Sequence, residues 1–84
     1  MPEIEVGRVT DFFAHPVVAG INLTGELRVG DTIRIKGHTT DVELQVESMQ
    51  LDHQEVPAAQ AGQSVGVRVP GRVRHGDHVY KVVP

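Results

Sequence analysis

The chain has 84 residues, with 11 acidic and 8 basic side chains, a formal net charge of −3 and no cysteine. This length fits one domain, 1–84, without room for a second. The absence of cysteine excludes a disulfide framework and a thiolate metal site and suits a cytoplasmic protein. The acidic balance argues against a protein that coats nucleic acid through charge alone.

No membrane association is expected. No apolar run approaches the roughly 20 residues that a spanning helix needs. The start, Met1 to Glu5, is acidic and lacks the apolar stretch of a signal peptide.

The composition predicts an all-β fold with short strands. Valine is abundant, and nine glycines and five prolines supply many turns. No segment of ten or more residues carries a helical apolar period.

The first predicted strand covers about residues 3–13. Its apolar parity changes between Val6 and Val9, which predicts a bulge or bend near Gly7–Arg8. His15–Pro16 is expected to end the segment, because proline has no N–H for a central ladder.

A second strand is predicted over 17–24, followed by a tight loop anchored by Leu27 and Val29. Gly30 is expected to supply a positive φ in that loop. One face of the second strand is expected to carry Val17, Ala19, Ile21 and Leu23.

Residues 32–36 and 41–49 are predicted to form a hairpin through 37–40. Its outer face should set Arg34 and Lys36 against glutamates, in cross-strand pairs that contribute about 0.2–1 kcal/mol each. A second parity shift, after Val46, predicts a bulge near Glu47–Ser48.

The remaining pattern is strand and turn. Residues 52–55 read as a polar loop or short edge, 64–69 as a strand that ends at Pro70–Gly71, and 78–83 as the closing strand after a turn at Gly76–Asp77. We therefore predict a small closed barrel of six to seven mostly antiparallel strands.

Three blocks carry a family resemblance. Residues 27–35, Leu-Arg-Val-Gly-Asp-Thr-Ile-Arg-Ile, resemble the L-x-x-G-D-x-I/V-x-I segment of the β-barrel that follows the GTPase domain in translation factors. Elongation factor Tu, initiation factor 2 and the selenocysteine-specific elongation factor share that segment. Residues 46–50 with 56–67 are similar to a second family block, and Gly7 to Thr10 to the family's G-x-V opening.

The resemblance implies a barrel of the translation-protein type that contacts tRNA, ribosomal RNA or a translation-related protein. Similar barrels occur as free-standing proteins and appended to U32-type peptidases, which are linked by resemblance to RNA modification. The sequence has no G-x-x-x-x-G-K-[ST] motif, so we expect no GTPase activity.

The strongest local charge feature lies near the C-terminus, where Asp77 alone opposes a run of basic side chains. Arginine suits contacts to RNA phosphates because its planar fork binds them through two hydrogen bonds. The alternative is a solvated loop and strand end, and the few aromatic rings argue against a stacking platform. The candidate RNA-binding residues are Arg68, Arg72, Arg74, His75, His78 and Lys81.

Other side chains point to no catalytic or cofactor site. His75, Asp77 and His78 lack further ligands nearby, so we expect no metal and no cofactor. Ser48 and Ser64 have no neighbouring base, and we therefore expect no enzyme. Of the adjacent Phe12 and Phe13, one should fill the core and the other face outward.

Two functions follow. The first is a non-catalytic binding module that contacts RNA or the translation apparatus. The alternative is a protein-interaction accessory for a separately encoded enzyme, such as a U32-type peptidase-like RNA-modifying protein. The sequence leaves the oligomeric state open.

Overall fold

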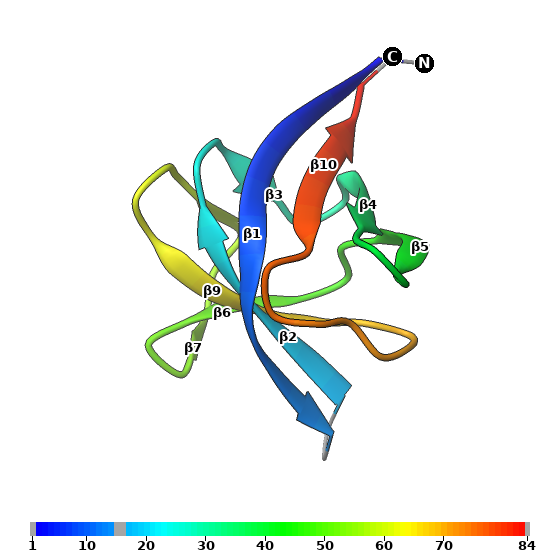
Figure 1. The fold of residues 1–84 in the computed structure, drawn as a ribbon. Coiled ribbons are helices and arrows are strands. Elements are labelled where there is room, and N and C mark those ends of the chain that lie inside the picture. The colour runs from blue at the N-terminus through cyan, green and yellow to red at the C-terminus, as the bar shows by residue number, and fades with distance from the viewer. Residues whose placement is uncertain (1, 15–16, 84) are drawn as a thin grey trace.

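The computed structural model describes residues 2–14 and 17–83, so the predicted strand end at His15–Pro16 lies outside the described residues. The described residues form ten strands and no helix, which confirms the all-β prediction (Figure 1). No helix in this part of the chain is long and apolar enough to cross a membrane. The strands are β1 (Glu3–Ala14), β2 (Val17–Leu23), β3 (Leu27–Arg28), β4 (Thr32–Lys36), β5 (Asp41–Gln45), β6 (Met49–Leu51), β7 (Gln54–Glu55), β8 (Ala58–Ala59), β9 (Ser64–Arg68) and β10 (His78–Val82).

Eight strands form one antiparallel sheet in the order β5-β4-β10-β1-β2-β9-β6-β7, and β3 pairs with β8 in a second sheet. The predicted closed barrel is wrong, because among the described strands the edges β5 and β7 do not pair with each other. The strand number was also too low. The two-residue strands β3, β7 and β8 are too short to produce an alternating apolar pattern.

Strand β1 contains two irregularities that turn its side chains over. Its register against β10 shifts between Glu5 and Gly7, and its register against β2 shifts between Val9 and Asp11. The first shift lies beside the predicted bulge near Gly7–Arg8 and confirms a bend in this region. Because of the first shift, Val6 and Val9 are both buried although they lie three positions apart.

The predicted hairpin is formed by β4 and β5, with Arg34 opposite Glu43. The predicted bulge near Glu47–Ser48 is wrong: pairing with β4 ends at Gln45, and from Met49 the chain pairs with β9 in β6. The parity shift thus marks a change of partner strand.

The loop before β4 is held by Leu27, which is fully buried, and by Gly30, whose φ of 99° confirms the predicted left-handed position. Val29 was predicted to anchor the loop too, but 42% of its surface is exposed. Its backbone N–H donates to Pro57 O at 3.0 Å, which sets its side chain beside the segment before β8.

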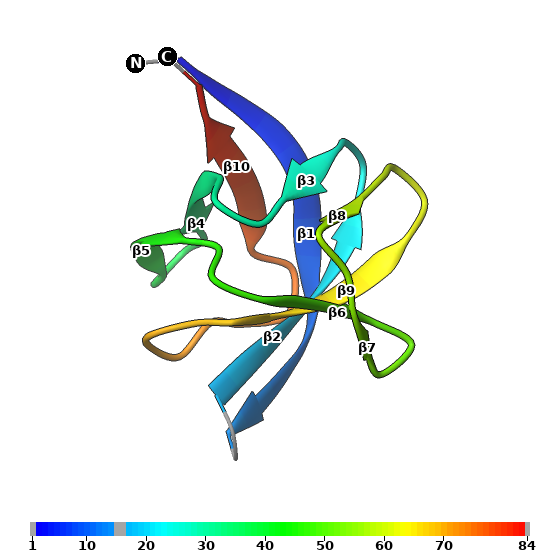
Figure 2. The ribbon, with the colours of Figure 1, turned by 180° about the vertical axis from the view of Figure 1, so that it is seen from behind.

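The core lies between the curved large sheet and the small β3–β8 sheet (Figure 2). As predicted, β2 sends Ala19, Ile21 and Leu23 inward, and Val65, Val67 and Val69 are buried. The predicted division of the two phenylalanines is confirmed, because Phe12 packs against the core whereas 57% of Phe13 is exposed.

Gly7 provides the test of the β1–β2 contact. A Cβ at this position would lie 2.7 Å from Asn22 O, a backbone atom, and 2.9 Å from a methyl group of Ile21. Gly7→Ala should therefore lower the free energy of unfolding by about 1–3 kcal/mol, measured by urea denaturation. Gly71→Ala is the control, because no atom lies within 4 Å of its Cβ position. An unchanged midpoint for Gly7→Ala would contradict the close approach.

Candidate functional site

Four of the six predicted RNA-binding residues lie in one segment, 68–75, at the end of β9 and in the loop that follows. Arg68, Arg72, Arg74 and His75 are all exposed. Among the described residues, no acidic group lies within 4 Å of the three arginine side chains. This segment therefore presents unneutralised cationic groups to solvent.

The loop is fixed to β1 and not loosely attached. Val73 is buried, so its neighbours Arg72 and Arg74 point outward from a pinned backbone. Gly76 N–H donates to Val9 O at 2.7 Å, and Val9 N–H donates to Asp77 O at 2.8 Å. The Asp77 carboxylate closes the turn by accepting from Arg74 N–H at 2.8 Å.

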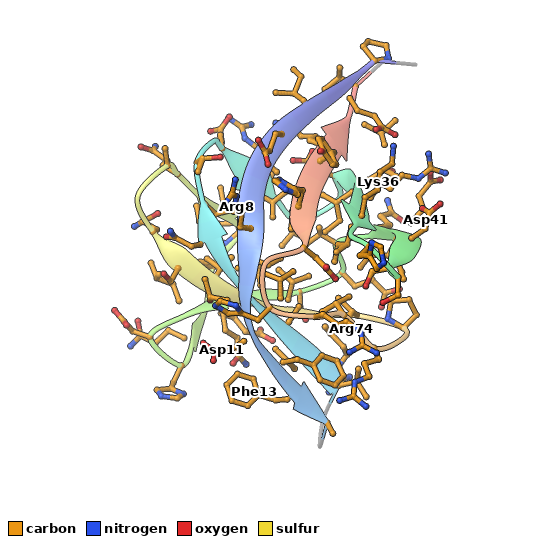
Figure 3. The ribbon with its side chains drawn as sticks, in the orientation of Figure 1. Arg8, Asp11, Phe13, Lys36, Asp41 and Arg74 are labelled. Atoms are coloured by element: carbon orange, nitrogen blue, oxygen red, sulfur yellow. The ribbon has the colours of Figure 1, made fainter. Side chains whose placement is uncertain are left out.

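Two phenylalanines lie near this segment, on the β1–β2 arm that residues 11–14 of β1 and 17–20 of β2 form. The Arg72 guanidinium lies 5.9 Å from the ring centroid of Phe12, at the outer limit of a cation–π contact. In Figure 3, Arg74 and Phe13 lie on opposite sides of the arm. The Phe12 ring, and not that of Phe13, therefore lies beside the arginine segment.

His78 and Lys81 do not join the arginines. They are three residues apart in β10 and so face opposite sides of the sheet. His78 Nδ1 contacts the Glu5 carboxylate. Lys81 Nζ donates to Glu26 O at 3.2 Å and lies 3.8 Å from Asp31. Both side chains are thus occupied by acceptors of this chain.

A charged network covers the outer face of β1, β10, β4 and β5. Arg34 lies 3.5 Å from Glu43, which confirms the predicted cross-strand pairing, and 3.5 Å from Asp41. Lys36, predicted to face a glutamate of the hairpin, instead donates to Glu3 of β1 at 3.0 Å, and Glu3 also lies 3.3 Å from Arg34. Sequence reasoning missed Glu3, because its proximity depends on how β10 places β1 near β4.

A groove runs along the other side of the molecule, where the chain crosses from β5 to β6. A cavity of about 330 Å³ adjoins a second of about 190 Å³, and the two share Ser48 and Glu55. The first is lined by Val29, Glu47, Ser48, Met49, Glu55, Val56 and Pro57, and the second by Val18, Ser48, Gln50, Glu55, Gly66 and Arg68.

Sequence reasoning did not find this groove. The predicted strand over 41–49 placed Glu47 in the hairpin, whereas the break after Gln45 carries Glu47 to another part of the surface. Arg68 belongs both to the predicted cationic set and to the groove. The residues that the structure describes contain no group of three His, Asp or Glu side chains placed to hold a metal ion.

Comparisons with curated proteins match segments of longer chains. The chain is 48% identical over 79 residues to an uncharacterized protease of Methanocaldococcus jannaschii, covering 93% of this chain and 19% of that protein. It is 37% identical over 81 residues to a collagenase of Porphyromonas gingivalis, covering 94% and 20%. The chain thus spans about a fifth of the length of the curated relatives it matches. No family model matches it.

Solved structures share the fold. The C-terminal domain of a Geobacillus thermoleovorans protein assigned as a U32 peptidase superposes with a TM-score of 0.86 at 18% identity, covering 93% of this chain and 91% of that one. GDP-bound aIF5B of Aeropyrum pernix, a translation factor, superposes with a TM-score of 0.71 at 21% identity, covering 100% and 15%. The translation-factor-like β fold is thereby supported, as a likeness of fold.

The expectation that the chain is no enzyme is corrected by these comparisons. The curated relatives carry the names protease and collagenase. The search for a nucleophile beside a base covered side chains within 84 residues. In the relatives the matching segment is about a fifth of a longer protein, so a search within 84 residues does not address the activity of the longer chain.

The Glu3 network makes stability depend on pH. The hydrogen bond from Lys36 and the charges of Lys36 and Arg34 hold the pKa of Glu3 below its ordinary value of 4.5, against the opposing effect of burial. This contribution to stability is present above pH 4.5 and is lost as pH falls through the lowered pKa of the folded state.

Below pH 4.5, the free energy of unfolding should therefore fall more steeply for the wild type than for Glu3→Gln. Lys36→Met should also flatten this dependence, because it removes the main cause of the lowered pKa. Urea unfolding at a series of pH values on either side of 4.5 measures both effects. Equal slopes for wild type and Glu3→Gln would exclude the proposed linkage.

Proposed function

We propose that this chain acts as an accessory module of a U32-type peptidase-like protein. The observation that carries the proposal is the 48% identity over 93% of the chain to one segment of a protein named as a protease. The likeness to an isolated C-terminal domain of a U32 peptidase, with a TM-score of 0.86, supports the same association. In this proposal the module supplies binding surfaces to the longer protein or to an enzyme encoded separately.

The structure has two candidate binding surfaces of opposite charge. One is the segment 68–75 with its exposed arginines, beside Phe12 on the β1–β2 arm. The other is the groove lined by Glu47 and Glu55. Both are built on backbone that is fixed by hydrogen bonds to the sheet, which is the arrangement that a binding module needs.

A second candidate function is contact with RNA, which the exposed segment 68–75 favours. Three arginines without a described acidic partner and a nearby aromatic ring suit a phosphate backbone. The likeness of fold to a translation factor supports this function weakly, because one fold carries many functions. His78 and Lys81 would contribute little, since acceptors of this chain already occupy them.

A chimera tests the accessory role. In the Porphyromonas gingivalis collagenase, the segment that matches this chain is replaced by the chain itself, deleted, or replaced by an unrelated β-domain of similar length. Digestion of collagen should survive the first change and be strongly reduced by the other two, because only this chain retains the complementary surfaces. Full activity of the deletion, or a folded chimera no better than the deletion, would overturn the proposal.

A salt titration tests contact with RNA. Binding of tRNA or ribosomal subunits, followed by fluorescence anisotropy, should weaken steeply as salt rises. The double variant Arg72→Ala, Arg74→Ala should reduce the slope of log K against log salt by about 1–2. Arg8→Ala, which removes an exposed charge from β1, should leave the slope unchanged. Failure of both RNAs to bind at low salt contradicts this second function.

A further inference from the structure

The groove at the β5–β6 crossing has the form of a small ligand site. Three segments build its larger cavity: Val29 after β3, residues 47–49, and residues 55–57. Its volume of about 330 Å³ lies at the lower end of the range for ligand pockets, about 300–1,000 Å³. A space of this volume has room for a side chain of a bound partner.

The lining of this cavity combines apolar surface with negative charge. Val29, Met49, Val56 and Pro57 supply carbon atoms, and 42% of Val29 is exposed. Val29 is one of the few large apolar side chains of the described residues that face solvent to this extent. Such a wall favours the aliphatic part of a ligand, as in the stem of a lysine or arginine side chain.

The charge of the cavity determines which ligand charge it favours. Glu47 and Glu55 are both exposed, and neither has a described cation within 4 Å. Two unneutralised carboxylates repel the phosphates of a nucleic acid and attract an ammonium or guanidinium group. Charge complementarity thus favours a cationic occupant.

The smaller cavity extends the site in one direction. It shares Ser48 and Glu55 with the first cavity and leads to Gln50 and Arg68. The amide of Gln50 can donate to and accept from a peptide backbone, and Arg68 suits an acidic side chain further along the same ligand. At Gly66 the floor has no side chain. With Glu47 in one cavity, Arg68 in the other and Glu55 in both, the groove fits an extended polypeptide with charges of both signs.

We propose that this groove binds an extended segment of a partner protein that places a lysine or arginine, flanked by apolar residues, between Glu47 and Glu55. The acidic end fixes the basic side chain, the apolar wall packs against its stem and its neighbours, and Arg68 sets the direction of the segment. This interaction goes beyond the proposed association with a U32-type protein and does not require it.

Binding of a labelled peptide to the 84-residue chain tests the proposal. The probe is a nine-residue acetylated and amidated peptide with a central Val-Lys-Val, compared with peptides in which norleucine or glutamate replaces the lysine. Fluorescence anisotropy should give the order lysine, norleucine, glutamate, with lysine bound most tightly. Glu47→Gln and Glu55→Gln should each weaken the lysine peptide roughly three-fold, and the double variant roughly ten-fold, as exposed ion pairs do.

The control variant is Asp11→Asn, which removes one exposed carboxylate on β1 outside the groove and should leave affinity unchanged. In the double variant the lysine and norleucine peptides should bind alike, which assigns the charge selectivity to the two glutamates. Amide chemical shifts on titration should change at Val29, Ser48 and Val56.

Three outcomes would overturn the proposal. One is equal binding of the lysine and glutamate peptides, and another is an unchanged affinity in the double variant. The third is displacement of the lysine peptide by tRNA together with tRNA-induced shifts at Val29 and Val56, which would assign the groove to nucleic acid.

Discussion

Strand β1 joins the two halves of the large sheet, pairing with β10 over Glu3 to Arg8 and with β2 over Gly7 to Ala14. To do both while facing one core, it must turn its side chains over twice, which the register shifts after Glu5 and after Val9 accomplish. Gly7 belongs to both pairings and lies against the backbone of β2 so closely that no Cβ fits. Three features take their positions from this strand: the arm that carries the phenylalanines, the loop after β9, which is hydrogen-bonded to Val9 through Gly76 and Asp77, and the network around Glu3.

Alternation predicted the elements whose neighbours are close in sequence. The β4–β5 hairpin, the inward valines of β9 and the left-handed Gly30 follow from local rules of parity and turn geometry. The break after Gln45 did not follow. Val46 is buried, and its backbone is hydrogen-bonded to Gly30 and Asp31. A bulge and a change of partner strand both require an apolar residue here, so the sequence does not distinguish them. An open and a closed sheet differ in which distant segments pair with each other, and apolar alternation in a single sequence does not reveal those pairings.

For the candidate site too, the sequence predicted groupings of nearby residues and not those that depend on distant segments. Arg72 and Arg74 share a loop, and both are exposed at the same part of the surface. His78 and Lys81 lie in a strand, where their odd spacing places them on opposite faces. The groove depends on segments from three parts of the chain, and its glutamates look like any solvated pair until the fold brings them beside Val29. The shared fold of a U32 peptidase domain and a translation factor means that such surface groups, and not the architecture, must distinguish their functions.

Arg68 makes the two surfaces interdependent. It begins the cationic segment and also lines the basic end of the groove. A peptide whose acidic side chain engages Arg68 withdraws that guanidinium from the cationic surface, and a phosphate bound there withdraws it from the groove. By reciprocity, each ligand then weakens the other by the same factor. A cationic peptide without an acidic residue leaves Arg68 free and escapes this coupling. The antagonism is therefore limited to peptides that carry an acidic residue for Arg68.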